Sequence, residues 1–306
     1  MTNETNSAAV NALDGLAQAM LASVQPLIDA RIEQEIEAQK AKIGVRKIEI
    51  SFNGKESKVD GLVHRAFDSV LKIISAGLNP LLVGPAGCGK TKLCSDVAKA
   101  IDKDFASISC SIGMSESELT GWLLPSGEGG RFEYLASPFI NMYEMGGAFL
   151  IDEMDAADAS VLVTLNQALA NGGFFCAKRG IHGGDAFVRR DKDSVVFAAA
   201  NTYGNGAGHA YVGRNQLDAT TLDRFVIIDV DYDRDLESNL GSGQVCDYIW
   251  TLRDKAKASG LRRVVGTRAI QKMDSLVAAG FSFRESKDFI LSGWTKDELS
   301  KVGEAA

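Results

Sequence analysis

The chain has 306 residues, of which 45% are hydrophobic and 24% charged, a composition typical of globular proteins with one large or two to three small domains. No run approaches the roughly 20 apolar residues that a membrane-spanning helix needs. The first twenty residues have neither a basic leader nor an uninterrupted apolar core, so we expect a cytoplasmic protein without membrane contact. The net charge of −7 disfavours recruitment of nucleic acid through overall charge.

Cysteine usage argues against a disulfide framework and against a structural zinc site. The chain has five cysteines, an odd number, without a CxxC pair. We therefore expect reduced, mostly buried thiols at Cys88, Cys94, Cys110, Cys176 and Cys246.

The N-terminal region has the apolar spacing of an amphipathic helix from about Ser7 to Lys42, interrupted or kinked near Pro26. Such a helix either packs on the main domain or forms an arm for a partner, and the pattern leaves both open. The alternating residues Ile48–Phe52, followed by Asn53 and Gly54, predict a strand that enters a hairpin.

Apolar strands and helical patterns then alternate along the chain. We predict strands at Leu81–Val83, Phe105–Ser109, Ala148–Ile151, Val195–Ala200 and Phe225–Val230, and helices that include Lys92–Ile101 and Ala159–Ala170. Short apolar strands separated by helices predict an α/β fold, a three-layer sandwich with a five-stranded parallel sheet between helices. After Asp233 the pattern is helical, which predicts a small separate helical domain.

A phosphate-binding loop stands between the first of these strands and a helix. The sequence GPAGCGKT, from Gly84 to Thr91, is the P-loop pattern in its proper strand-to-helix context. Glycines let the backbone curl with its amides toward phosphate, and the helix dipole favours the same anion. We expect Lys90 to reach the β- and γ-phosphates of ATP and Thr91 to bind Mg²⁺. The expected nucleotide contacts are Gly84, Pro85, Ala86, Gly87, Cys88, Gly89, Lys90, Thr91 and Lys92.

The segment AFLIDEMDAAD is expected to supply the metal anchor and the water-activating group. Asp152, at the carboxyl end of a buried strand, would hold Mg²⁺ through water, and Glu153 would polarise the attacking water. Alone, the pattern also fits an ordinary strand that ends in a solvated acidic turn. The P-loop upstream favours the catalytic interpretation.

Two later polar residues are further candidates. Asn201 follows the strand Val195–Ala200 and would orient the water or touch the γ-phosphate, or else form a turn before the Gly-rich stretch Gly204–Gly208. Arg224 precedes the last strand, where spacing alone favours a surface ion pair.

The order of these motifs resembles the AAA+ superfamily and, within it, the MoxR/CobS-like group of the dynein-related type, over roughly residues 58–300. The resemblance implies that Asn201 is sensor 1, that Arg224 is an arginine finger for the adjacent subunit, and that Arg268 in GTRAI is sensor 2 on a helical lid. With Glu153 these are the expected catalytic residues. The implied domains are an N-terminal helical segment (1–44), a nucleotide-binding domain (45–233) and a lid (234–306).

This group also carries two insertions, which here correspond to Ile112–Pro138 and Asn171–Asp193. The insertions contain five aromatic residues, which either pack under their own loops or grip a threaded partner: Trp122, Phe132, Tyr134, Phe174 and Phe175. The chain departs from simple expectation at Cys88 and in the Gly-rich segment after Asn201.

The function implied by the resemblance is that of a homo-hexameric ring that hydrolyses ATP with Mg²⁺ at subunit interfaces to remodel a protein client, often with a von Willebrand A-domain partner. One alternative is the ATPase subunit of a cobaltochelatase, although the histidines are isolated. Another is a nucleic-acid motor, which draws on basic residues of the second insertion that alternate with aspartates. These residues are Arg179, Arg189, Arg190 and Lys192.

Overall fold

The computed structural model describes residue 31 and residues 45–52, 55–127, 130–206 and 213–304. The chain divides into two compact units, Met1–Arg46 and Lys47–Ala306. The helix predicted for Ser7–Lys42 lies outside the described residues except at Arg31, which is helical.

A two-stranded sheet precedes the main domain and consists of β1 (Val45–Phe52) and β2 (Lys55–Leu62). The strand predicted at Ile48–Phe52 is thus confirmed, although β1 starts three residues earlier. The expected turn residues Asn53 and Gly54 lie outside the described residues.

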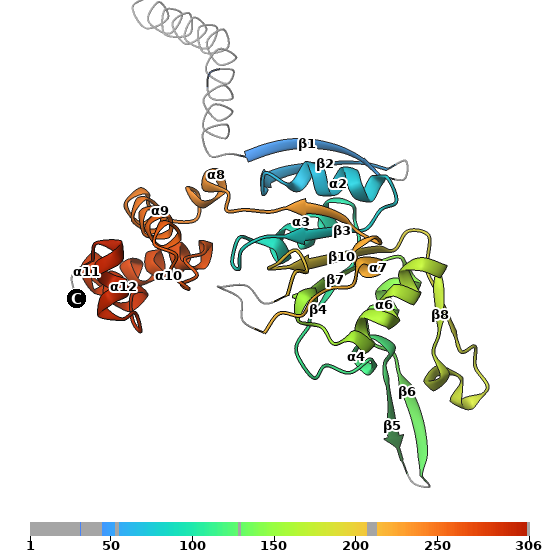
Figure 1. The fold of residues 1–306 in the computed structure, drawn as a ribbon. Coiled ribbons are helices and arrows are strands. Elements are labelled where there is room, and N and C mark those ends of the chain that lie inside the picture. The colour runs from blue at the N-terminus through green and yellow to red at the C-terminus, as the bar shows by residue number, and fades with distance from the viewer. Residues whose placement is uncertain (1–30, 32–44, 53–54, 128–129, 207–212, 305–306) are drawn as a thin grey trace, which may run out of the picture. The chain divides into compact units, whose positions relative to one another are not determined.

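The main domain is built on a five-stranded sheet in the order β11-β3-β10-β7-β4 (Figure 1), in which every neighbouring pair is parallel. The strands are β3 (Pro80–Val83), β4 (Phe105–Ser109), β7 (Ala148–Asp152), β10 (Val195–Ala200) and β11 (Val226–Asp229). The five predicted strands are confirmed with end shifts of one residue at most. Strands that are distant along the chain are neighbours here, which requires helical crossovers.

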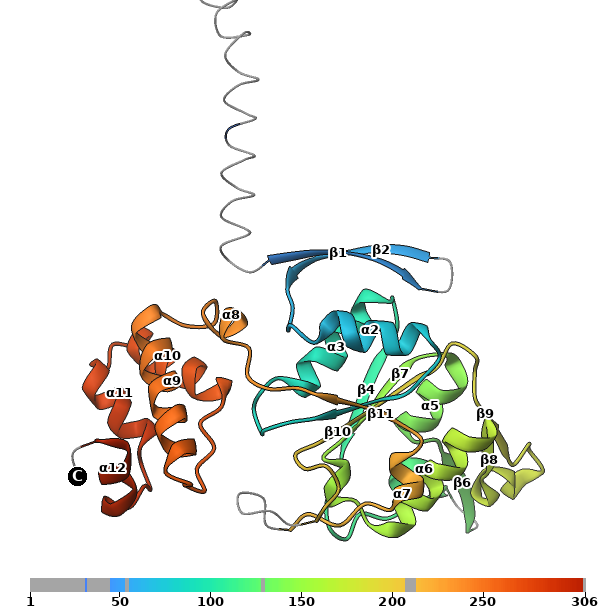
Figure 2. The ribbon, with the colours of Figure 1, turned by 45° about the horizontal axis from the view of Figure 1, so that its top comes forward.

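Both faces of this sheet are buried, as the alternation along β7 shows. Leu150 belongs to one core cluster, whereas Phe149 and Ile151 belong to the other. The first cluster packs beneath α2 (Phe67–Ser75) and α3 (Lys90–Ala100), and the second beneath α5 (Pro138–Met145) and α6 (Ala159–Asn171). Figure 2 shows α2 and α3 on the opposite side of the sheet from α5 and α6. Two apolar faces need two helical layers, so the predicted three-layer α/β sandwich is confirmed.

The two predicted insertions each contain a small antiparallel pair of strands. The first holds α4 (Ser117–Thr120), β5 (Trp122–Ser126) and β6 (Arg131–Leu135). The second holds β8 (Gly173–Phe175), the 3₁₀ helix η2 (Ala177–His182) and β9 (Phe187–Arg189). The Lys178 ammonium connects them, because its Nζ donates to Ser117 Oγ at 2.7 Å and to Gly121 O at 3.3 Å.

The aromatic residues of the insertions have different environments. Phe174 is buried beside Phe139, with ring centroids 6.3 Å apart. The Tyr134 hydroxyl donates to Thr120 O at 2.8 Å, whereas Phe132 and Phe175 are exposed. Packing therefore accounts for Phe174 and Tyr134, but it does not account for the two exposed rings.

The C-terminal helices form a separate cluster with its own apolar core (Figure 1). After the short α7 (Ala219–Leu222) and the last strand, they are α8 (Arg234–Glu237), α9 (Gly243–Ala258), α10 (Thr267–Ala278), α11 (Phe283–Ile290) and α12 (Lys296–Val302). Capping boxes start α11 at Ser282 and α12 at Thr295. Within the described part of the chain, no helix combines the length and apolarity needed to cross a bilayer.

Candidate nucleotide-binding site

The glycines of the P-loop are required for two different reasons. Gly87 and Gly89 have φ angles of 76° and 98°, in the left-handed region that glycine adopts without strain. At Gly84 a Cβ would lie 1.8 Å from the carbonyl oxygen of Val230. The reason expected from sequence, free approach of phosphate, therefore does not apply at Gly84, where the neighbouring backbone already excludes a side chain.

The loop presents its donors at the start of α3. Gly89 is the N-cap residue, and Lys90 and Thr91 are the first helical residues. The first amides of a helix have no acceptor within the helix, so they can donate to an anion at its N-terminus, and the helix dipole favours an anion at the same place. The Lys90 ammonium donates to Gly84 O at 2.7 Å, Pro85 O at 3.1 Å and Asn201 Oδ1 at 2.9 Å. Burial lowers the pKa of Lys90 from its ordinary value.

Thr91 and Asp152, the two expected metal ligands, lie side by side. Thr91 Oγ1 donates to Asp152 Oδ2 at 2.6 Å, and Asp152 Oδ1 accepts from the Glu153 amide at 2.9 Å. One carboxylate and one hydroxyl form an all-oxygen donor set of the kind that holds Mg²⁺ together with water and phosphate oxygens. The residues present therefore fit a magnesium ion.

Glu153 follows β7 in an unusual backbone conformation. Its φ is 54°, one of two positive values among the described non-glycine residues, and its side chain is 43% exposed. A non-glycine residue in this region persists only where its surroundings hold it, and such residues gather at functional sites. The conformation turns the chain from the strand into the 3₁₀ turn η1 (Met154–Ala156).

Asn201 is held against this turn by Asp155, a residue that the sequence analysis did not assign. The carboxylate of Asp155 is fully buried, and its Oδ2 accepts from the amides of Asn201 and Thr202 at 3.2 and 3.1 Å and from Thr202 Oγ1 at 2.9 Å. Asp155 thus fixes the start of the segment that presents the Asn201 amide to Lys90.

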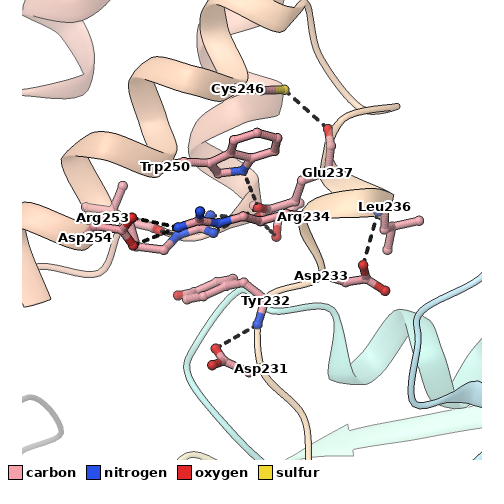
Figure 3. A network of polar contacts seen from close by, with 12 residues as sticks. Asp231, Tyr232, Asp233, Arg234, Leu236, Glu237, Cys246, Trp250, Arg253 and Asp254 are labelled. Carbon is pink, nitrogen blue, oxygen red and sulfur yellow. Dashed lines mark hydrogen bonds and ion pairs between the residues drawn. The ribbon is translucent and has the colours of Figure 1, made fainter. Parts of the chain in front are cut away.

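A polar network lies between Tyr232 and the helical lid (Figure 3), and it also contacts the P-loop. The Tyr232 hydroxyl donates to Ala86 O at 2.9 Å, and the guanidinium of Arg253 lies 3.7 Å from the centroid of the Tyr232 ring. Arg253 forms two hydrogen bonds with the buried carboxylate of Glu237, at 2.6 and 2.9 Å. Figure 3 shows Trp250 beside the same carboxylate. The indole Nε1–H of Trp250 donates to Glu237 Oε2 at 2.7 Å.

The start of α10 touches the loop directly. The Thr267 amide donates to Gly87 O at 3.2 Å, and Thr267 Oγ1 donates to Glu237 Oε1 at 2.6 Å. Gly266 approaches so closely that a Cβ there would lie 3.0 Å from Ala86 O. The next residue, Arg268, is exposed and lines the same cavity as the P-loop. The lid therefore meets the loop at the position expected for a second sensor.

A cavity of about 540 Å³ lies between these elements, a volume within the usual range of small-molecule sites. Its lining combines the loop with residues of the sheet edge and the lid, including Lys90, Thr91, Lys92, Asp152, Glu153, Asn201, Glu237, Thr267, Arg268 and Gln271. Of the nine expected nucleotide contacts, Gly84 and Pro85 are not among the residues that line this cavity. Lys92 does line it, but its exposed ammonium pairs with Asp96 on α3.

Arg224 is the one expected catalytic residue that lies away from this cavity. Val226 pairs with Pro80 at the start of β3, whereas the P-loop follows Val83 at the end of that strand. The two ends of β3 are about 10 Å apart, and Arg224 precedes Val226 by two more residues. Its Nε is buried and has no hydrogen-bond partner among the described residues.

Sequence reasoning missed Asp155, Arg214, Tyr232 and the Glu237–Arg253 pair. Asp155 stands in an acidic turn, where it cannot be told from a solvated carboxylate by pattern alone. Arg214 contacts Glu153 across 61 residues and Tyr232 contacts Ala86 across 146 residues, so no local spacing signals either contact. Glu237 and Arg253 are 16 residues apart and lie on two different helices, a spacing that carries no helical signal.

The parallel sheet and the loop between β3 and α3 define the fold as that of a P-loop NTPase. The family profile that matches is that of the AAA domain of the dynein-related subfamily, over residues 79–225, just under half of the chain.

Two relatives are similar to part of the chain. The chain is 29% identical over 185 residues to the uncharacterized protein YojN of Bacillus subtilis (strain 168), which covers 60% of this chain and 56% of YojN. It is 28% identical over 181 residues to the uncharacterized protein SAB1265c of Staphylococcus aureus (strain bovine RF122 / ET3-1), covering 57% of this chain and 64% of that protein. The chain thus spans less than two thirds of the length of these relatives.

A solved structure of a protein from Cytophaga hutchinsonii ATCC 33406 is similar over 91% of this chain and 98% of that chain, with a TM-score of 0.42 and 16% sequence identity. This likeness is too distant to bear on function.

Proposed function

We propose that the chain is a Mg²⁺-dependent ATPase of the AAA+ type, and that it acts as a MoxR/CobS-like ring that remodels a partner protein complex. The observation that carries the proposal is the convergence of Lys90, Thr91, Asp152, Glu153 and Asn201 at one end of the parallel sheet, around a single cavity. These residues lie at the start of α3 and at the carboxyl ends of β7 and β10. Together they supply the phosphate-binding, metal-binding and water-activating groups that phosphoryl transfer to water requires.

Each residue has a role that follows from its position. The loop amides and Lys90 bind phosphate oxygens, and Lys90 then exchanges its contacts with loop carbonyls for contacts with the nucleotide. Thr91 and Asp152 hold the magnesium ion, which when bound supplies charge neutralisation at the phosphates. Glu153 accepts a proton from the attacking water, and Asn201 orients that water or the γ-phosphate.

Assembly into a ring is the more specific part of the proposal. It is supported by the position of Arg224, which lies near the start of β3 and away from its own P-loop at the other end of that strand, where it would be placed to serve the site of another subunit. Exposed Phe132 and Phe175 on the two insertions would face a protein client. The basic residues of the second insertion favour protein contacts over nucleic acid, because Arg179 pairs with Glu144 and Arg189 pairs with Asp185.

Substitution Glu153→Gln tests the ATPase assignment. The variant keeps the shape of the side chain but removes the base, so we expect ATP affinity within about twofold of wild type and a fall in turnover of about 10²-fold or more. Binding is measured by calorimetry and turnover by phosphate release, with Glu133→Gln on the exposed strand β6 as the matched control. Loss of ATP binding in Glu153→Gln, or undiminished turnover, would contradict the assigned role.

A further inference from the structure

Arg214 lies next to the proposed catalytic base although it is 61 residues away along the chain. The residue that follows Arg214 is anchored on the turn after Glu153. The Asn215 amide donates to Asp155 O at 2.7 Å, and Asn215 Nδ2 donates to Ala157 O at 2.9 Å. The backbone on either side of this contact is therefore fixed relative to the turn.

The guanidinium of Arg214 is shared between two carboxylates. Nη2 is 3.4 Å from Glu153 Oε1, and Nη1 is 3.5 Å from Glu153 Oε2 and 3.4 Å from Asp155 Oδ1. The Arg214 side chain is only 13% exposed. Its planar fork can face two acceptors at once, which an ammonium cannot do.

Asp155 determines where Arg214 lies. Asp155 is fully buried, its Oδ2 is occupied by bonds from Asn201 and Thr202, and its Oδ1 makes no hydrogen bond within the described residues. A buried carboxylate without a counter-charge is costly. Because Arg214 is the cation that faces Oδ1, the guanidinium is tied to the turn, and its remaining nitrogen is directed at Glu153.

The Glu153 carboxylate, in contrast, has few other contacts within the part of the chain that the structure describes. Its carboxylate is 43% exposed, and Arg214 is the partner that the structure gives to its two oxygens. A glutamate that activates water must have its carboxylate held within hydrogen-bond reach of that water. Glu153 lines the cavity, whereas Arg214 is absent from the cavity lining. Arg214 therefore contacts the glutamate from outside the cavity.

We propose that Arg214 is a positioning residue that aims the Glu153 carboxylate at the attacking water. The proposal rests on the ATPase function above. It differs from the simpler role in which Arg214 only neutralises Asp155, because only the positioning role makes turnover depend on the contact with Glu153.

The test compares Arg214→Ala and Arg214→Lys with the wild-type full-length chain in ATP turnover with Mg²⁺. We expect Arg214→Ala to lower kcat about 10- to 100-fold, as the loss of an orienting neighbour typically does, with KM within about twofold of wild type. Lysine retains the charge and should restore part of kcat. Arg189→Ala, which removes an exposed arginine–aspartate pair, should leave kcat unchanged.

A second pair of variants separates positioning from folding. In Arg214→Ala combined with Asp155→Asn no buried charge remains unpaired, and asparagine still accepts from the Asn201 amide, so the fold is retained while Glu153 stays without its partner. The kcat loss should persist in this double variant at a melting temperature near that of wild type. In a Glu153→Gln background, Arg214→Ala should lower the residual turnover no further.

Three results would overturn the inference: wild-type kcat in Arg214→Ala, full recovery of kcat in the double variant, or losses that multiply in the Glu153→Gln background. A wild-type chain that binds no ATP or never hydrolyses it would instead refute the proposed function. The two failures are distinguished by the wild-type measurement alone.

Discussion

At the scale of single residues, Cys88 shows how a reactive group can stand inside a phosphate loop without being reactive. The side chain is 3% exposed, and its Sγ lies 3.2 Å from Val230 O, to which the thiol donates. Burial raises the pKa of the Cys88 thiol above its ordinary value. Since the thiolate is the reactive form, a raised pKa means less thiolate at neutral pH and a slower reaction with electrophiles.

We therefore expect Cys88 in the folded protein to be alkylated by iodoacetamide at pH 8 about tenfold more slowly, or slower still, than in the urea-unfolded chain. The rate in the folded protein should rise as the pH is raised beyond the ordinary thiol range. Mass spectrometry of the labelled peptide identifies the site, and Cys88→Ser is the control for assignment. Equal labelling of folded and unfolded chains would show that the loop thiol is accessible and ionised.

At the scale of elements, the junction between the last strand and the lid depends on one buried ion pair. Glu237 at the end of α8 and Arg253 on α9 are 1% and 10% exposed at their side chains, with a shortest contact of 2.6 Å. Arg253 also donates to Val265 O at 2.6 Å. The pair thereby connects α8, α9 and the segment before α10, the same helix whose first amide bonds the P-loop.

Breaking this pair should destabilise the lid far more than breaking an exposed pair of the same kind. We expect Glu237→Gln to lower the free energy of unfolding by about 3–5 kcal/mol, because a buried guanidinium loses its counter-charge. Asp254→Asn, which removes the partner of Arg234 at a half-exposed pair, should cost about 1 kcal/mol or less. Urea denaturation measures the free energy of unfolding of both variants. Equal losses would show that the buried pair stabilises the lid no more than the exposed pair does.

At the scale of the whole molecule, the proposed function requires a neighbouring copy of the chain to complete each site. The cavity contains the loop, the metal ligands, the base and the first sensor, but the described residues place Arg224 at the opposite end of the sheet. In phosphoryl transfer, an arginine supplied by a neighbour is worth about 10³ to 10⁵ in rate. Assembly would then control hydrolysis.

Mixing two inactive variants tests this arrangement. Arg224→Ala and Glu153→Gln should each bind ATP and assemble but fail to turn it over. In an equal mixture, about a quarter of the interfaces of a ring pair an intact Glu153 with an intact neighbouring Arg224, and turnover should return at those interfaces. A mixture as inactive as its components, or wild-type turnover by assembled Arg224→Ala, would remove the arginine from this role.

The five central strands, the phosphate loop and the acidic residues at the end of β7 could all be predicted from the sequence. Strands such as Ala148–Ile151 are short apolar runs bounded by turn residues, and the loop motif occupies eight consecutive positions, so that all the information is local. The order of the strands in the sheet, β11-β3-β10-β7-β4, was not predicted, because no single segment encodes which strands become neighbours.

The contacts that hold the proposed catalytic residues in place could be found only in the folded structure. The contact of Arg214 with Glu153, and that of Tyr232 with Ala86 O, join segments 61 and 146 residues apart. No periodicity or spacing encodes such a pairing, because it depends on where the parallel strands end and on which distant segments the fold brings together there. Burial of Asp155 is likewise a property of the packed turn, and it is this burial that makes a counter-charge at Arg214 necessary.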